Sequence, residues 1–276
     1  MLDANQKHEH GPLKTHFFFL VMGRNCEKWI SRSFKSLLMQ KHRDFTCMYV
    51  DDASSDRSFE RAKRIVGSDS RFRIQRNEER RYTLCNRLEA VSRSGAGASD
   101  VFVVLDADDW LSDKGVLSYV ADAYQNPNVW ITHGSYLIWR DLLRYRLGLR
   151  KKRGISNPFK SEVIKRRTFR QQPITASHLR TFRRFLWDAI PPGDLLDQRG
   201  DLMKCTEDFA TMIPMLEMAG GSHSLHIDRV MYYYNESNPR GVMKSNRQAQ
   251  LENEAHIRSL SPRPLLDFQG QPVKGS

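Results

Sequence analysis

Three carboxylates follow a short apolar run near the middle of the chain. Residues 103–105 lead into Asp106, Asp108 and Asp109, with one alanine between the first two. A strand that ends at the carboxyl edge of an open α/β sheet places such side chains in the crevice where these sheets bind ligands. Carboxylate oxygens suit Mg²⁺ or Mn²⁺, which usually share their coordination with substrate phosphates. The pattern predicts a metal site at Asp108, supported by Asp106 or Asp109, unless these are ordinary turn residues.

A second acidic strand end lies upstream. Residues 46–50 are typical of a strand, which ends on Asp51 and Asp52 and then breaks into the small polar residues 53–56. Such residues favour turns and helix caps, and capping of the next helix is the plain structural alternative. Two adjacent carboxylates repel each other unless a hydrogen-bond donor or a positive charge lies between them. A nucleobase edge or a metal-bound phosphate would meet that need.

A third acidic pair occurs downstream, where Glu207 and Asp208 follow Thr206 at the start of an apolar helical segment. Thr206 is a suitable cap, and an acidic first turn matches the positive end of the helix dipole. Pro214 should kink or shorten this helix. A simple helix start is therefore the alternative to a functional site here.

Taken in chain order, segments 51–56, 106–109 and 206–208 resemble the motifs of the family 2 glycosyltransferases, which have the GT-A fold. The resemblance runs from about Phe17 to about Tyr234. Within it, residues 17–21 are similar to the family's first strand, and residues 23–25 take the place of its short nucleotide-contacting loop. Three motifs in the expected order are far more specific than any one of them.

The resemblance implies an inverting transfer of a sugar from a nucleotide-diphosphate donor to an acceptor hydroxyl. Asp208 would be the general base of a single displacement, with Glu207 orienting its neighbours. A divalent cation, Mn²⁺ or Mg²⁺, would assist departure of the diphosphate. The residues expected to contact the nucleotide-sugar donor are Arg24, Asn25, Asp51, Asp52, Arg80 and Asp106.

The closing segment departs from the family pattern. Relatives often place an Arg and then a His after an aromatic strand, whereas residues 233–240 of this chain contain no His. Asn235, Glu236 or Lys244 could take its place near the metal or diphosphate. Residues 23–25 also lack the Pro and aromatic residues common in that loop, so the base of the donor stays open.

Alternating strand-like and helix-like segments in the first half predict a parallel α/β sheet. The fold expected is a GT-A, Rossmann-like, mostly parallel sheet flanked by helices, in a single domain with a C-terminal extension. We expect a flexible segment over 1–15, a domain over 16–240 and a tail over 241–276. Within the domain, residues 16–125 would bind the nucleotide sugar and residues 126–240 the acceptor. The expected strands are 16–22, 45–50, 71–75, 101–105, 129–132, 135–139 and 230–234, and the expected helices are 27–40, 57–66, 82–93, 113–125, 178–190 and 245–258.

The net charge of +12 over 276 residues is concentrated in one segment. Residues 140–187 hold 15 Lys or Arg against two acidic residues, which gives +13 there and −1 elsewhere. This segment could contact anionic lipid head groups, nucleic acid or the donor diphosphate, or it could be a solvated loop. Residues 140–177 read as a long irregular basic loop that could act as a lid. In the tail over 241–276, the part that follows the expected helix should be loosely held.

The remaining features indicate a cytoplasmic setting. No apolar run approaches the roughly 20 residues needed to span a bilayer, and residues 1–15 lack the apolar core of a secretory signal. The four cysteines, Cys26, Cys47, Cys85 and Cys205, show no metal-type spacing. A reducing compartment is the simplest account, with peripheral contact at the cytoplasmic face of a membrane as an option.

Three functions are compatible with these residues. The favoured one is the sugar transferase, with a glycan, a lipid-linked intermediate or a protein as acceptor. A nucleotidyltransferase would need a glycine- and lysine-rich loop after the first strand, and residues 23–25 are too short for one. A non-enzymatic binder of membranes or nucleic acid through the basic segment comes last, because strand-end carboxylates repel nucleic acid.

Overall fold

A sheet of eight strands, in the order β3-β2-β1-β4-β7-β6-β8-β5, forms the centre of the computed structural model. The structure describes residues 15–149, 156–173, 175–238 and 247–273. The first four strands are mutually parallel, β7 is antiparallel to both its neighbours, and β6 and β8 are parallel to each other. The strands are β1 (Phe17–Gly23), β2 (Phe45–Asp51), β3 (Phe72–Arg76), β4 (Val101–Asp106), β5 (Trp110–Leu111), β6 (Ile131–Ile138), β7 (Arg180–Arg183) and β8 (Ser224–Tyr234).

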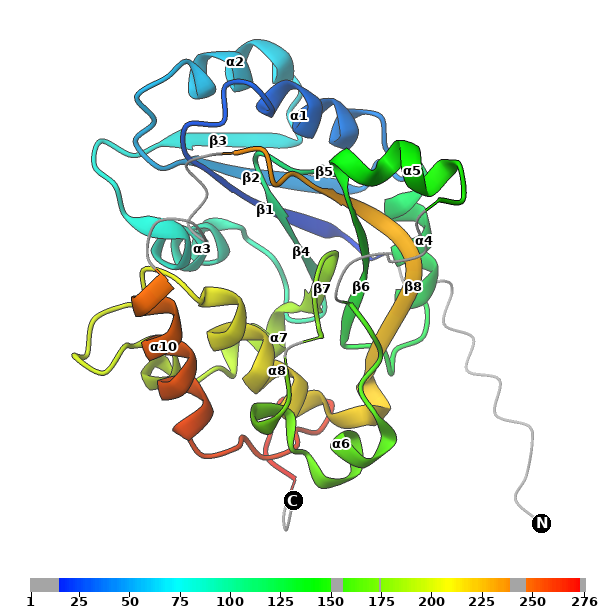
Figure 1. Ribbon diagram of the computed structural model, residues 1–276, viewed down its shortest axis with the longest axis vertical. Helices are drawn as coiled ribbons and strands as arrows, with labels where there is room; N and C mark the ends of the chain where they lie inside the picture. Colours follow the sequence, from blue (N-terminus) through cyan, green and yellow to red (C-terminus); the bar gives the residue numbers. More distant parts are fainter. Residues whose placement is uncertain (1–14, 150–155, 174, 239–246, 274–276) are drawn as a thin grey trace.

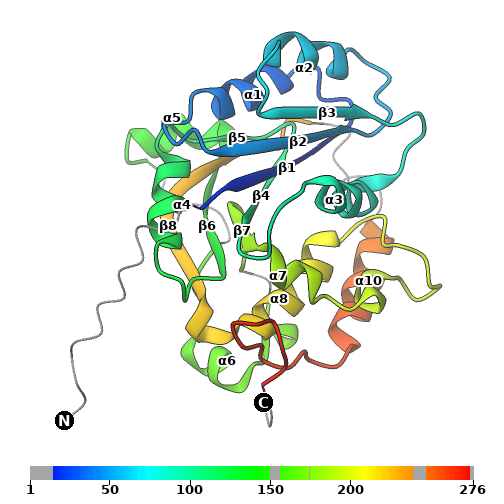
Figure 2. The ribbon, with the colours of Figure 1, turned by 180° about the vertical axis from the view of Figure 1, so that it is seen from behind.

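Helices cover both faces of this sheet (Figures 1 and 2). Along β1, Phe17, Phe19 and Val21 belong to the core on one face, while Phe18 and Leu20 belong to the core on the other. This alternation follows from the twofold period of a strand. The first core is completed by α1 (Ile30–Leu38), α2 (Ser58–Val66) and α4 (Val116–Tyr124), and the second by α3 (Tyr82–Arg93), α7 (Arg184–Asp188) and α8 (Glu207–His223).

The predicted α/β fold is confirmed, and the first four strands and helices match the sequence reading closely. The second half required corrections. The two strands expected over 129–132 and 135–139 are one strand, β6 (Ile131–Ile138), because an irregularity of register between Gly134 and Tyr136 lets pairing with β8 continue. Residues 178–190 are not one helix, since the stretch begins with β7, paired between β4 and β6. Tertiary pairing therefore overrides the helical spacing of its apolar residues.

The segment over 140–177 is not wholly irregular. It contains two single 3₁₀ turns, η1 (Trp139–Asp141) and η2 (Phe169–Gln171), and two short helices, α5 (Leu142–Arg146) and α6 (Ser161–Arg166). Residues 150–155 and 174 lie outside the described part, as do residues 1–14, for which a flexible segment was predicted. The lid function stays a prediction.

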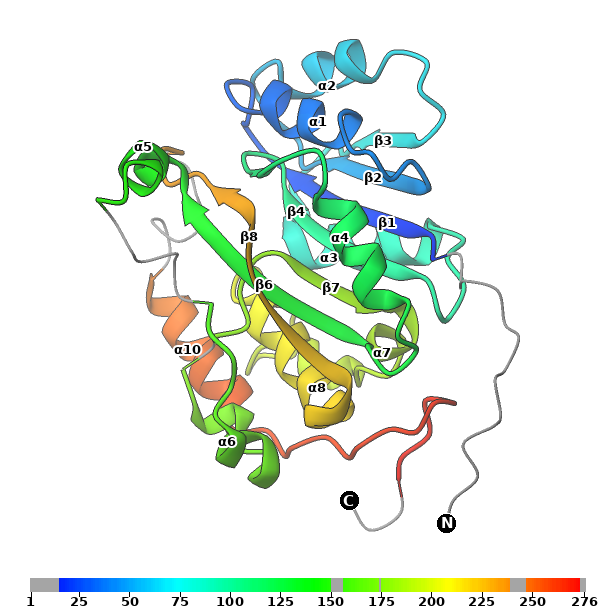
Figure 3. The same ribbon diagram turned by 90° about the vertical axis from the view of Figure 1, so that its right-hand side faces the viewer.

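The helix α8 continues through Pro214, and its non-helical residue is Gly220, with φ of 59°. The aromatic strand β8 is longer than expected, starting at Ser224. After the turn η3 (Pro192–Leu195), the chain reaches α8, and α10 (Arg247–Ser259) follows β8 (Figure 3). The segment after α10 is not loosely held, because Leu266 is buried and donates its backbone N–H to Met218.

Within the described residues, no helix is both long and apolar enough to span a bilayer.

Candidate active site

Parallel pairing brings the acidic strand ends to one edge of the sheet. In the register, Gly23 lies opposite Asp51, and Met22 lies opposite Asp106. The loops after β1, β2 and β4 therefore start side by side at their carboxyl ends, where open α/β sheets bind ligands. Gly23 is needed for this approach, because a Cβ placed there would lie 2.5 Å from the Cβ of Ala107.

Asp51 shapes its own loop. Its side chain is fully buried and accepts hydrogen bonds from the Ser54 backbone N–H at 2.9 Å and the Ser54 hydroxyl at 2.6 Å. Tyr49 donates a third, at 3.2 Å. With no exposed surface, this carboxylate orders the loop after β2, and its expected contact with a nucleotide-sugar donor stays a prediction.

Asp52 holds the loop between β3 and α3 against the end of β2. It accepts hydrogen bonds from the backbone N–H groups of Arg81 (2.7 Å) and Tyr82 (3.0 Å), and from the Asn77 amide at 3.1 Å. Since Arg81 and Tyr82 begin α3, Asp52 acts as a cap supplied from another strand. The guanidinium of Arg80 lies 4.0 Å away.

The loop after β1 joins the same edge. Arg24 donates to the backbone carbonyl of Asp52 at 3.1 Å, and the Asn25 side chain accepts a hydrogen bond from the Ser55 backbone at 2.9 Å. Asn25, Ala53, Tyr82 and Thr206 all have positive φ, between 54° and 68°. Backbone held in this sparsely populated region tends to cluster at functional sites. Asn25, Ala53 and Tyr82 lie in the three segments around Asp51 and Asp52, and Thr206 lies two residues before Asp208.

Asp109 anchors the acidic loop to β8. Its two oxygens accept hydrogen bonds from the Tyr232 hydroxyl at 2.6 Å and from the Asn235 backbone N–H at 2.7 Å. Burial, together with the charges of Asp108 and Asp106, holds the pKa of Asp109 well above its usual range. Because both oxygens already have protein donors, Asp109 is the least suited of the three acids to a cation.

Asp108 and Asp106 are more open. Asp108 accepts one hydrogen bond, from the Asn238 amide at 2.8 Å. The Asp106 carboxylate receives none from the described part of the chain, and burial raises its pKa to about 7. No group of three or more His, Cys, Asp or Glu side chains among the described residues forms a ready metal site. Two half-buried carboxylates do fit Mg²⁺ or Mn²⁺, which take the rest of their ligands from water and substrate phosphates.

Asp208 lies in a cluster of alternating charge. It forms an ion pair with Arg180, whose side chain is 4% exposed, while that of Asp208 is 38% exposed. Burial would raise the pKa of Asp208, but the charges of Arg180 and Arg87 outweigh it and lower this pKa to about 2. The Arg180 guanidinium also lies 3.1 Å from the His178 ring. Asp208 is thus held as a carboxylate.

The same cluster includes Asp106. Arg180 lies at the start of β7, opposite Val104 and therefore near the end of β4. Its charge lowers the pKa of Asp106, whereas the charge of Asp208 raises it. The predicted cap at Thr206 is absent, because this residue has φ of 68° and its buried hydroxyl has no hydrogen-bond partner among the described residues. The Arg180 pair orients Asp208 in its place.

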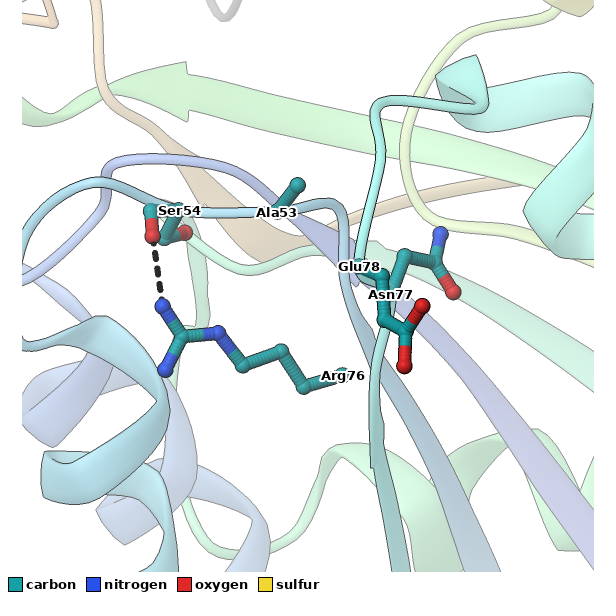
Figure 4. A pocket seen from close by; sticks show the side chains of 5 residues that line it. All are labelled: Ala53, Ser54, Arg76, Asn77 and Glu78. Carbon is teal, nitrogen blue, oxygen red and sulfur yellow. Dashed lines mark hydrogen bonds between the residues drawn. The ribbon is translucent and has the colours of Figure 1, made fainter.

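Two cavities flank the loop between β3 and α3. One, of about 340 Å³, lies beside the end of β2, and Figure 4 shows the Arg76 side chain reaching across it to the Ser54 carbonyl at 2.8 Å. The other, of about 380 Å³, lies between this loop and the segment before α8. The first is lined by Ala53, Ser54, Arg76, Asn77 and Glu78, and the second by Arg80, Arg81, Tyr82, Cys85, Asp201, Leu202, Met203 and Lys204.

The sequence alone does not identify Arg180 as a residue of this site, because it lies in the basic segment. It is internal and pairs with Asp208. Two other arginines of that segment are also internal: Arg170 pairs with Glu217, and Arg183 donates to backbone carbonyls. The basic segment is therefore not one solvated surface. At the position expected for a His, Asn235 and Asn238 contact the acidic loop, Glu236 pairs with Arg140, and Lys244 lies outside the described residues.

A sheet with acids at the carboxyl ends of its parallel strands, and an ionised carboxylate at a nearby helix start, is the arrangement expected of an α/β transferase. The sequence profile described as "Glycosyl transferase family 2" matches residues 20–190, more than half of the chain. The chain therefore belongs to glycosyl transferase family 2. This membership favours the sugar-transferase hypothesis over the two alternatives.

Individual relatives are distant. An "Uncharacterized glycosyltransferase" of Haemophilus influenzae is 26% identical over 115 residues, which cover 41% of this chain and 43% of that protein. Residues 1–349 of S. aureus TarS, solved with UDP-GlcNAc, are 18% identical with a TM-score of 0.56, over 80% of this chain and 59% of that fragment. A mannosyltransferase of Pyrobaculum calidifontis, solved with GDP-Man and Mn²⁺, is 17% identical with a TM-score of 0.58, over 92% of this chain and 67% of the enzyme. The chain thus spans less than two thirds of the first two relatives, and these solved structures support the fold.

Proposed function

We propose that this protein transfers a sugar from a nucleotide-diphosphate donor to an acceptor hydroxyl, with inversion at the anomeric carbon. The observation that carries the proposal is the ionised Asp208, paired with Arg180 and placed in one charged cluster with Asp106. Family membership supports the reaction class. The UDP-GlcNAc and GDP-Man complexes of the structural relatives support a nucleotide sugar as donor.

The donor is assigned to the edge formed by residues 16–125. The 340 Å³ cavity beside Ala53 and Asn77 suits a nucleobase, with the Arg76 guanidinium at its wall as a hydrogen-bond donor. Arg24, Asn25 and Arg80 line the route from this cavity to the acidic loop. Asp108 and Asp106 would hold a divalent cation, which supplies positive charge for the departing diphosphate when it is bound.

The acceptor is assigned to residues 126–240. The acceptor oxygen attacks the anomeric carbon, the bond from that carbon to the diphosphate oxygen breaks, and the diphosphate leaves with the bonding electrons. The acceptor proton passes to a carboxylate oxygen of Asp208. Arg180 fixes the orientation of that carboxylate, and its exposed fraction of 38% leaves it accessible to an incoming hydroxyl. A glycan, a lipid-linked intermediate and a protein are all suitable acceptors, and a cytoplasmic location fits this chemistry.

A thermal-shift screen of nucleotide sugars, each with and without Mn²⁺, tests the donor. A bound donor raises the melting temperature by mass action, by an amount that grows with concentration. We expect at least one nucleotide-diphosphate sugar to stabilise the protein more than the matching nucleoside monophosphate. Failure of every donor in both conditions would refute the donor assignment.

Asp208→Asn tests the base. Because this change preserves shape and removes the proton acceptor, transfer should fall by about 10² to 10⁴-fold while the donor-induced thermal shift is retained. Asp122→Asn, which makes the same change at an exposed carboxylate of α4, is the matched control and should retain most activity. Equal turnover of wild type and Asp208→Asn would remove Asp208 as the base.

A further inference from the structure

Three leucines point into solvent on and just beyond α5. Leu143, Leu147 and Leu149 are 68%, 62% and 74% exposed, which makes them prominent among the exposed large apolar side chains of the described residues. Leu147 donates its backbone N–H to the carbonyl of Leu143 at 3.0 Å, so these two lie one helical turn apart. Residues at i and i+4 share one face of a helix. The segment therefore presents a small apolar face.

Positive charge surrounds this face. Arg146 is exposed within α5, and Arg140, 64% exposed, precedes it and makes a 3.5 Å ion pair with Glu236, which is itself 42% exposed. Exposed ion pairs of this kind contribute little and leave most of the cation's field open to solvent. By sequence, residues 140–153 contain seven Lys or Arg and a single acid, Asp141.

The position of α5 in the molecule favours contact with a flat surface. It lies at the periphery in all three ribbon views (Figures 1, 2 and 3). Its base is packed against the rest of the domain, because the rings of Trp110 and Trp139 contact each other and the Arg32 guanidinium lies over both, 4.7 and 4.6 Å from their centroids. Trp110 directly follows the acidic loop, so α5 is linked to the site edge through packed aromatic side chains.

We propose that residues 140–149 dock this protein onto an anionic bilayer surface. Leu143, Leu147 and Leu149 would enter the interface, and Arg140 and Arg146 would contact the lipid head groups. Apolar side chains flanked by arginine are the features that hold amphipathic segments in the plane of a membrane interface. A docking site for an acidic protein would need a groove or a complementary face, and three protruding leucines provide neither. This inference concerns binding to lipid and stands independently of the transferase reaction.

Co-sedimentation of the full-length protein with vesicles tests the proposal. We expect binding to vesicles of 70% phosphatidylcholine and 30% phosphatidylglycerol, and at least tenfold weaker binding to pure phosphatidylcholine. Each basic residue near an anionic surface contributes about a fivefold gain in affinity. Arg140→Gln with Arg146→Gln should therefore lower the affinity by on the order of tenfold. The matched control, Arg57→Gln with Arg93→Gln, changes two exposed arginines elsewhere and should stay within about twofold.

The leucines are tested in the same assay. Replacing Leu143, Leu147 and Leu149 together by Ser should weaken vesicle binding on the order of a hundredfold, because most of their apolar area would no longer be buried. Met39→Ser with Leu251→Ser, which removes exposed apolar side chains elsewhere, should bind like wild type. Wild-type binding by the triple variant, or no vesicle binding by the wild-type protein, would overturn the proposal.

Discussion

Removing the positive charge of Arg180 should move the pH dependence of transfer. In the wild-type protein, Arg180 and Arg87 lower the pKa of Asp208 to about 2, so the base is ionised at every pH at which the protein is expected to be folded. In Arg180→Met the charges of Arg87 and His178 still oppose the burial that raises this pKa. We expect the pKa of Asp208 to rise from about 2 toward 3.8, its ordinary value.

The consequence can be measured as the acid limb of kcat/KM, which reports ionisation of the free enzyme. Activity is lost as pH falls through the pKa of the base, because a protonated carboxyl cannot accept the acceptor's proton. Below that pKa the rate falls about tenfold per pH unit. Protonation of Asp106 should give both proteins an acid limb near pH 7. Below it the wild-type profile should show no further decline from Asp208 down to pH 5, while Arg180→Met should show a second decline within the measurable acid range.

Arg180→Lys separates charge from packing. Lysine retains the positive charge, so the acid limb should stay near that of wild type even if kcat falls through poorer orientation of Asp208. Thermal unfolding and donor binding, measured in parallel, show whether each variant is folded and loaded. Coincident acid limbs for Arg180→Met and wild type would refute the reasoning, as would an equal shift in Arg180→Lys.

Three further predictions concern the scaffold. Glu217→Leu should lower the free energy of unfolding by about 3 kcal/mol, because it removes the bidentate partner of the buried Arg170 and leaves only the longer contact with Asp194, and adding Arg170→Met should restore part of the loss in urea titrations. Gly23→Ala should reduce the donor-induced thermal shift by forcing the loops after β1 and β4 apart, whereas Gly193→Ala, with open space at its Cβ, should not. Only the thiol of Cys85, the one cysteine not buried, should react rapidly with a disulfide reagent before denaturant is added, and rapid native reaction of more than one thiol would contradict this packing.

The first half of the fold was predictable from sequence because each local signal agrees with the tertiary structure. In β1, β2 and β4, β-branched and aromatic residues end abruptly on polar ones, and amphipathic helices separate the strands. Parallel pairing then places Asp52 and Asp106 at one edge without further information. The acidic motifs could be located for this reason.

The rest depends on contacts that local patterns do not encode. β7 has four residues, and pairing with β4 and β6 decides its state. Arg180 reads as one more solvated cation until β7 places it beside Asp208. The sequence does not distinguish the roles of Asp51 and Asp52. In the structure the Asp51 carboxylate accepts hydrogen bonds from Ser54, whereas the Asp52 carboxylate accepts them from the loop between β3 and α3.

The hydrogen bonds between Asp52 and the first turn of α3 give this residue a structural role in addition to any contact with a nucleotide. Its carboxylate fixes the backbone at Arg81 and Tyr82, and through them one wall of the 380 Å³ cavity. Even an exchange for asparagine would remove a negative charge and substitute an amide nitrogen for one of the two accepting oxygens. Position 52 therefore tolerates little variation for architectural reasons alone, before any nucleotide enters.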